Sequence, residues 1–235
     1  MPIGSKRTNW VLHYFRLIGL MPIYEDPHRT QDIWDTFFSD KKKGQKDTVT
    51  PLRERCAKKV ILHPVSSLFV IPKDWVWASF RQGGKEVKFD GKAKFTSATN
   101  ATRLPAFLRL KGKYFRFTPA PTPAGWPTPW EPDLKQGLLK NSMGKGQPCP
   151  IVRPLFPESW VVDGFADLDV NYTSFEKICD ILMEAGRLGG FGPFRPNCGG
   201  DYGTYEVDEL RPAKLEEWEE YNRLLNTAPL AEATA

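Results

Sequence analysis

The chain has 235 residues, of which 40% are hydrophobic and 26% are charged, and its formal net charge is +5. That length suits one large domain or two small ones that share a core, and we expect one. No apolar stretch approaches the roughly 20 residues that span a bilayer, and the first residues are polar and basic without a signal-peptide pattern. We therefore expect a cytoplasmic protein without a membrane partner.

The cysteines and histidines are too widely spaced to form a local metal site. The four cysteines include no CxxC pair, and no HxxxH or HxxE spacing links any two of the three histidines. We expect free thiols and neither a metal nor another cofactor. The residues concerned are Cys56, Cys149, Cys179, Cys198, His13, His28 and His63.

Charge is distributed unevenly along the chain. Residues 40–59 contain eight Lys or Arg against three acids, and residues 81–117 contain ten against two. Residues 201–221 reverse the sign, with eight acids against two Lys or Arg. The modest net charge therefore hides a strongly basic middle, whose field would attract a polyanion.

The N-terminal segment predicts a strand followed by an irregular region. Residues 10–18 are dense in aromatic and β-branched side chains and end before Gly19, which indicates a strand, central in its sheet. Residues 40–59 predict a basic loop that ends in a short helix, because Pro51 is tolerated in a first helical turn.

The middle of the chain alternates between strand and helix patterns. Residues 60–71 have strand character, and residues 72–81 have apolar positions at helical spacing. Residues 81–104 alternate basic, small and hydroxyl side chains without a sustained apolar face, so we expect a basic finger there. Residues 107–117 have strand propensity on both sides of Gly112, which predicts a tight hairpin.

Residues 118–132 contain six prolines, which remove backbone donors and exclude a helix interior or a central strand. We expect an extended proline-rich connector. Because the segment also carries Trp126 and Trp130, the alternative is a docking peptide for a protein partner.

The C-terminal third begins with a clear strand-to-helix pattern. Residues 160–170 predict a strand, and the Thr173 to Glu176 pattern is a capping box that opens a helix. Apolar residues then follow at helical spacing, and Gly186 supplies a left-handed stop.

A glycine-rich loop at residues 188–196 and a last strand at residues 201–207 follow that helix, before an acidic tail at residues 206–235. Strand, helix, loop and strand form half of a ferredoxin-like fold. We therefore expect an α+β fold over residues 1–235, with a ferredoxin-like or RRM-like antiparallel sheet, helices on one face, and inserted loops or fingers.

The order of several motifs resembles a known family. The motifs are the strand ending in Gly19-Leu20-Met21-Pro22, the Ile71-Pro72 junction with Gly83-Gly84-Lys85, Val152-Arg153-Pro154, Phe156 with Trp160, the capped helix, residues 190–196, and residues 201–207. In that order they resemble a widespread family of uncharacterised phage and prophage proteins. That family resembles the RAMP-type backbone subunits of CRISPR effector complexes, which have a modified RRM core with fingers and bind single-stranded RNA along a filament.

The resemblance implies a phage or mobile-element protein that binds nucleic acid, associates with itself or another protein, and acts in the host cytoplasm. The residues support single-strand binding independently, because a basic groove holds phosphates and aromatic faces stack bases. The alternatives are a solvated basic face and, for the glycine loop, a plain turn. The candidate contacts for single-stranded DNA or RNA are Arg81, Lys85, Lys88, Phe89, Lys92, Lys94, Phe95, Arg103, Arg109, Lys111, Lys113 and Arg195.

Two other classes of function compete with this interpretation. Asp163, Asp167 and Asp169 share one face of a predicted strand, but no nearby His or Lys completes a nuclease site, so we expect exposed acids and no catalysis. The glycine loop matches neither phosphate-binding motif. The second alternative is a phage protein-interaction factor, an inhibitor of a host complex or an assembly subunit, which the eight tryptophans and acidic end would suit.

Overall fold

The computed structural model describes residues 9–26, 52–140 and 146–227. Its main sheet has β1 (Trp10–Gly19) near the centre, between β10 (Val161–Asp169) and β11 (Tyr205–Pro212). Beyond β10 lie β7 (Tyr114–Thr118) and then β3 (Val70–Pro72), and every pairing is antiparallel. The strand expected at residues 10–18 is thus confirmed as a central strand.

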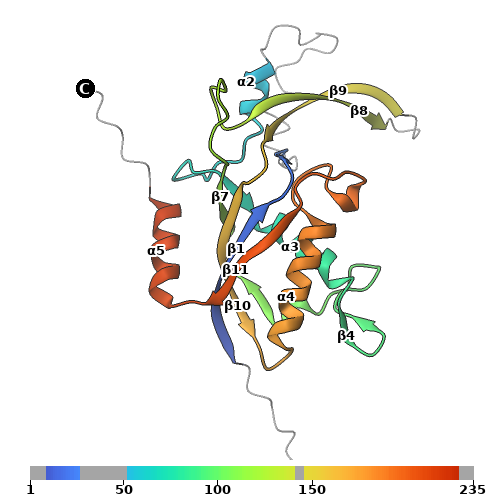
Figure 1. Ribbon diagram of the computed structural model, residues 1–235, viewed down its shortest axis with the longest axis vertical. Coiled ribbons are helices and arrows are strands. Elements are labelled where there is room, and N and C mark those ends of the chain that lie inside the picture. The colour runs from blue at the N-terminus through green and yellow to red at the C-terminus, as the bar shows by residue number, and fades with distance from the viewer. Residues whose placement is uncertain (1–8, 27–51, 141–145, 228–235) are drawn as a thin grey trace, which may run out of the picture.

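Two strand–helix–strand units form the core of the fold, in the ferredoxin arrangement. Helix α3 (Lys73–Gly84) lies between β1 and β7 in the chain, and α4 (Phe175–Glu184) lies between β10 and β11. The four strands of this double unit stand in the order β11, β1, β10, β7, and both helices cover one face of the sheet (Figure 1). The predicted α+β, RRM-like class is therefore confirmed.

The start and end of α4 differ slightly from the sequence prediction. The N-cap is Ser174 rather than Thr173, and its hydroxyl accepts a hydrogen bond from the Lys177 amide at 3.4 Å. The helix continues into the π turn η2 (Ala185–Gly189), and the left-handed residue that ends it is Gly190, with φ +60°, not Gly186. Capping patterns predict a helix end to within a few residues because neighbouring polar and glycine residues compete for the same role.

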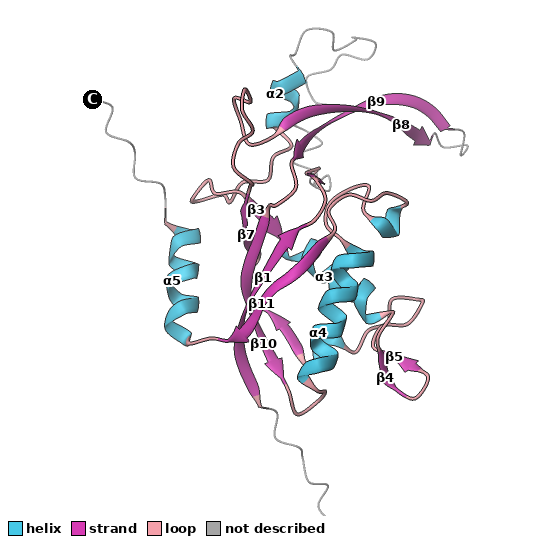
Figure 2. Cartoon of the chain, viewed as in Figure 1, coloured by secondary structure: helices cyan, strands magenta, loops and turns pink. Residues whose placement is uncertain are grey.

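The acidic segment that was predicted to be a tail, residues 206–235, is folded as far as residue 227. It forms β11 and then α5 (Leu215–Asn226), which lies on the opposite face of the sheet from α3 and α4 (Figure 2). Trp218 and Tyr221 of α5 pack on Phe165 with ring centres 5.7 and 5.2 Å apart. Helices therefore cover both faces, because Phe165 gives the second face an apolar centre. Residues 228–235 lie outside the described residues.

The expected hairpin at residues 107–117 is wrong. β6 (Leu108–Leu110) and β7 both pair with β10, at successive positions along it, so they form one interrupted strand. Gly112 has φ +75° and sits at the interruption. A glycine at positive φ fits a bulge as well as a turn, and only the partner strand distinguishes the two.

A second sheet forms an arm that extends from the main sheet (Figure 1). It consists of β2 (Ile23–Tyr24), β9 (Gly146–Phe156) and β8 (Glu131–Lys140), and we call the β8–β9 hairpin the arm. The proline-rich residues before Glu131 form no strand or helix after Thr118. At the base of the arm lies α2 (Leu52–Ala57), whereas residues 40–51 of the expected basic loop lie outside the described residues.

The basic finger contains a small hairpin of β4 (Lys88–Asp90) and β5 (Ala93–Lys94), and it leads into the 3-10 turn η1 (Leu104–Ala106). Another 3-10 turn, η3 (Pro196–Cys198), follows the glycine loop. In the part of the chain that the structure describes, no helix combines the length and apolar character needed to cross a bilayer.

Candidate nucleic-acid interface

A pocket of about 290 Å³ lies between α3 and the glycine loop. One wall is a stripe of α3 from Asp74 to Arg81, two turns that present one face of the helix. The other wall is the loop with Arg195. The pocket is lined by Asp74, Trp75, Ala78, Arg81, Gly190, Phe191, Gly192 and Arg195.

The glycine loop is fixed to the core beneath this pocket. Phe191 is fully buried and stacks on Tyr205, with ring centres 4.7 Å apart, and its amide donates a 2.9 Å hydrogen bond to the Gly203 carbonyl. Gly192 has φ +73°, and a Cβ there would lie 2.3 Å from the Tyr24 carbonyl oxygen. Only glycine fits that position, so the loop packs directly on the Tyr24 backbone and carries Arg195 to the edge of the pocket.

The two arginines of the pocket have few partners. An Arg195 Nη1 hydrogen donates to the Gly192 carbonyl at 2.8 Å. The Arg81 Nε is buried and finds no acceptor among the described residues, and within those residues neither guanidinium forms an ion pair, although Asp74 lines the same pocket. A buried N–H group without an acceptor is costly, and a bound anion would supply the missing charge-assisted hydrogen bond.

Basic side chains continue from the pocket onto the β4–β5 hairpin. Lys85 ends α3, and Lys88 and Lys92 are exposed; none of the three is ion-paired in the described parts of the chain. Lys94 pairs with Glu86 at 3.4 Å, but both side chains are about 40% exposed, so the pair contributes little. The candidates at positions 81, 85, 88, 92 and 94 thus remain available to a polyanion.

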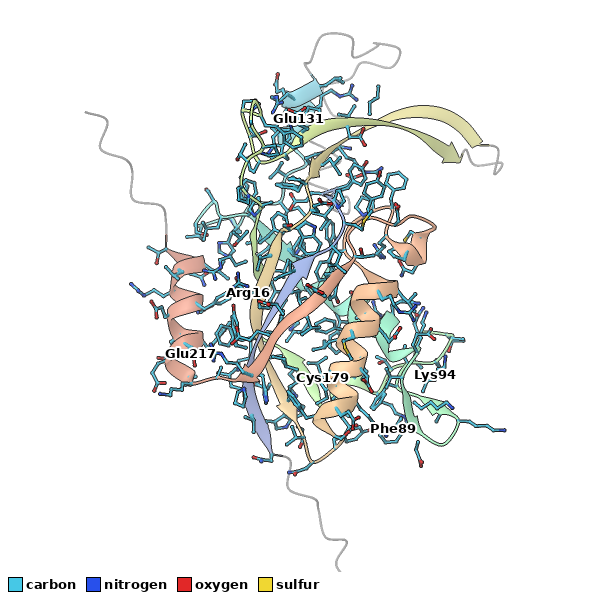
Figure 3. All side chains as sticks on the ribbon, viewed as in Figure 1. Arg16, Phe89, Lys94, Glu131, Cys179 and Glu217 are labelled. Carbon is cyan, nitrogen blue, oxygen red and sulfur yellow. The ribbon has the colours of Figure 1, made fainter. Side chains whose placement is uncertain are left out.

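Figure 3 labels residues on the two sides of the molecule. Phe89 and Lys94 lie at the hairpin beside α4, whereas Glu217 lies on α5, across the sheet. The α5 helix carries acids in its first turn. A nucleic acid would therefore be attracted to the basic hairpin and repelled by the first turn of α5.

The prediction that Phe95 stacks on bases is wrong. Phe95 has no exposed surface, and its ring packs edge-on against Phe89 at 5.3 Å and Phe107 at 5.2 Å. Phe95 anchors the finger to the core and cannot receive a base. Phe89 remains half-buried at the surface of the hairpin, and the Arg103 guanidinium lies over its ring at 4.8 Å.

The structure separates Arg109, Lys111 and Lys113 from the other candidates. The Arg109 guanidinium lies 4.0 Å over the Trp10 ring, and Lys111 pairs with Asp167 at 3.2 Å. These two side chains face the side of the sheet that α5 covers. Lys113 is exposed at the bulge between β6 and β7.

That second face of the sheet is nearly neutral. Asp163 is 3% exposed and accepts hydrogen bonds from Arg116 at 2.9 and 3.1 Å. Burial raises the pKa of Asp163, and the hydrogen bond from Arg116 opposes that rise. Asp169 is also 3% exposed. The strand acids expected at the surface are instead paired or buried, and no group of His, Cys, Asp or Glu among the described residues could hold a metal.

Two residues near the interface were not predicted from the sequence. Asp74 lines the pocket, and Lys177 of α4 donates from its Nζ to the Phe89 carbonyl at 2.8 Å. The signal for Asp74 was present, because Asp74 and Arg81 are seven residues apart and share a helix face. Nothing local could place Lys177 beside the hairpin, since the contact joins segments far apart in the chain.

Comparison with known proteins gives matches only among solved structures, because no protein-family model and no curated protein matches the chain. One is a chain of the structure described as type III-B Cmr-beta bound to cognate target RNA. It has 13% identity and a TM-score of 0.43, and the match covers 87% of this chain and 61% of that one. Another is Cmr6 from Pyrococcus furiosus, with 9% identity, a TM-score of 0.37, and coverage of 85% and 98%. At such identities the likeness concerns the fold alone, whose class the strand order already establishes.

Proposed function

We propose that this protein binds a single-stranded nucleic acid, RNA or DNA, through the α3 pocket and the β4–β5 hairpin, and that it catalyses no reaction. The observation that carries the proposal is the pair Arg81 and Arg195, which face one pocket from opposite walls without an ion pair to any described residue. Guanidinium groups match phosphate oxygens in geometry and charge.

A polymer suits the surface better than a small anion does. The unpaired cations extend from the pocket to Lys85, Lys88 and Lys92, so several phosphates in a row would each meet a positive charge.

A single strand suits the surface better than a duplex does. Its backbone can bend into a pocket, and its unpaired bases can stack on exposed planar side chains. A duplex is too stiff to bend into the pocket, and its bases are already paired and stacked, so it would have to melt first. The second face of the sheet, which RRM-like domains use for stacking, is covered here by α5 and is nearly neutral.

A protein-interaction role is the second candidate, and the projecting arm supports it (Figure 1). The proline-rich connector supports it less, because Trp130 is only 5% exposed and packs beneath Arg53. The two candidates differ in salt dependence, since an apolar protein interface is insensitive to the ionic strength that screens phosphate contacts.

The test is fluorescence anisotropy with labelled single-stranded RNA, single-stranded DNA and duplex DNA at two salt concentrations. We expect preference for a single strand and a log-log salt slope of about −0.7 per phosphate contact. Arg81→Ala and Arg195→Ala should each weaken binding by about tenfold, the size of one lost charge-assisted hydrogen bond.

Arg223→Ala is the charge-matched control, because Arg223 is exposed on α5 across the sheet, and its affinity should equal that of the wild type. Absence of binding to every strand at low salt would overturn the proposal. So would pocket variants that bind as well as the wild type.

A further inference from the structure

We propose that Arg103 is a base-stacking residue, the outer end of a ladder of rings that receives an unpaired base of the bound strand. The inference rests on the proposed function and names the group that contacts bases rather than phosphates. Four side chains at the foot of the β4–β5 hairpin form this ladder.

The four side chains form a continuous stack from the core to the solvent. Phe107 is fully buried, and its ring lies 5.5 Å from that of Tyr172 at an interplanar angle of 15°. The Tyr172 ring lies 5.6 Å from that of Phe89 at 28°, and the Arg103 guanidinium lies 4.8 Å from the Phe89 centre. The three rings are roughly parallel to one another. Tyr172 and Arg103 are both exposed, and only Arg103 has a planar cationic side chain.

The backbone holds the outer layer in place. The Arg103 amide donates a 2.8 Å hydrogen bond to the carbonyl of Phe95, which is buried. The Phe89 carbonyl is held by Lys177 at 2.8 Å. The backbone of Arg103 is therefore ordered before a ligand binds, so the entropy cost of stacking is confined to its side chain.

The chemistry of Arg103 fits an unpaired base. A guanidinium plane stacks on the π face of a base of any kind, which makes the contact tolerant of sequence. Within the described residues, the Phe89 ring is the partner of the Arg103 side chain, and no carboxylate pairs with it. Lys88 and Lys92, exposed on the same hairpin, would meet the adjoining phosphates.

Lysine separates stacking from charge, because it keeps the positive charge of arginine but lacks the plane. We therefore compare Arg103→Lys with the wild type on two labelled oligonucleotides of equal length, one with all its bases and one abasic at every central position. The matched control is Arg109→Lys, which changes another arginine that lies over a ring, that of Trp10, on the far face of the sheet.

We expect Arg103→Lys to weaken binding of the complete strand by about tenfold, within the range for one stacked base, and to leave binding of the abasic strand unchanged. Arg109→Lys should bind both strands like the wild type. Thermal unfolding confirms that each variant is folded.

The outcomes separate this inference from the proposed function. Wild-type protein that binds neither strand would overturn both. Wild-type binding with an Arg103→Lys variant that is unaffected, or is weakened equally on both strands, would overturn the stacking role and leave the binding function standing.

Discussion

The Arg153 guanidinium lies 4.9 Å from the centre of the Phe194 ring, and its Nε donates a 2.7 Å hydrogen bond to Asp26. Phe194 has φ +61°, a conformation that costs a non-glycine residue free energy. Its ring also meets that of Tyr24 edge-on at 5.7 Å. These contacts fix the backbone directly before Arg195, so the base of the arm is joined to the pocket.

We expect Arg153→Gln to weaken single-strand binding by about threefold to tenfold, which is between the values of an exposed and a desolvated cation–π contact. Because Arg153 acts through Arg195, the substitution should have no effect in an Arg195→Ala background. A double-mutant cycle measured by anisotropy checks this. Additive losses would mean that Arg153 touches the nucleic acid itself.

Lys59→Gln is the control for that cycle. Lys59 pairs with the same Asp26 carboxylate at 3.6 Å, so the variant removes a nearby cation without touching Phe194, and its affinity should stay close to that of the wild type.

Gly192→Ala should lower both stability and affinity. The alanine would need φ +73° and would place its Cβ 2.3 Å from the Tyr24 carbonyl oxygen, so the loop has to move. Gly199→Ala provides a comparison, since φ is +81° there but nothing lies within 4 Å of the added atom. Denaturant unfolding should show a loss of stability for both variants, which for Gly199→Ala comes from backbone strain alone. Anisotropy should show a loss of affinity for Gly192→Ala only. Equal effects of the two variants would contradict the close packing of the loop.

Phe95→Ala should destabilise the fold by about 3 to 5 kcal/mol, the usual cost of deleting a buried aromatic ring, because Phe95 has no exposed surface. Phe89→Ala should cost less, since the Phe89 ring is half-buried, but it removes the layer beneath Arg103. Urea denaturation measures both. A small loss for Phe95→Ala would mean that the finger is not anchored to the core.

Glu25 makes stability depend on pH. Its side chain is fully buried, and Oε2 accepts a 2.7 Å hydrogen bond from the Ile61 amide while Oε1 has no partner among the described residues. Burial raises the pKa of Glu25 well above its ordinary value of 4.5. The folded state therefore holds the proton more tightly than the unfolded state, and the stability gained at low pH is lost as pH rises from 4.5 through the raised pKa.

Glu25→Gln keeps the acceptor for Ile61 but cannot ionise. We expect its free energy of unfolding to match that of the wild type at the acid end of this range and to exceed it increasingly as pH rises. Urea denaturation at a series of pH values measures the difference. A difference that stays constant with pH would show that Glu25 is ionised or compensated in the folded protein.

Tyr221 fastens α5 to the sheet. Its hydroxyl donates to the Asp163 carbonyl at 2.7 Å and accepts from the Arg116 amide at 2.7 Å. Tyr221→Phe should therefore cost about 1 to 3 kcal/mol of stability, because two buried backbone groups lose their partner. Nucleic-acid affinity should not change, since α5 lies across the sheet from the pocket. A change in affinity measured on folded protein would place part of the interface under α5.

Local sequence patterns predicted correctly the helices and strands whose conformation depends on residues a few positions apart in the chain. The run of β-branched and aromatic residues in β1 and the helical spacing in α3 and α4 each identified an element correctly. Patterns failed where the outcome depended on a distant partner. Gly112 was expected to turn a hairpin, and Phe95 was expected to face solvent, because neither the pairing of β6 and β7 with β10 nor the packing of Phe95 on Phe107 leaves a local trace.

The sequence alone determined the ferredoxin-like class of the sheet, the basic middle of the chain and most of the residues that carry that charge, since periodicity and composition depend on neighbours a few positions apart. Only the tertiary structure decided which of those charges act together. It brought Arg81 and Arg195 to one pocket, paired Lys111 with an aspartate, and covered the second face of the sheet with α5. The reason is physical: hydrogen bonds, ion pairs and desolvation depend on distances between atoms, and segments far apart in the chain come within those distances only when it folds.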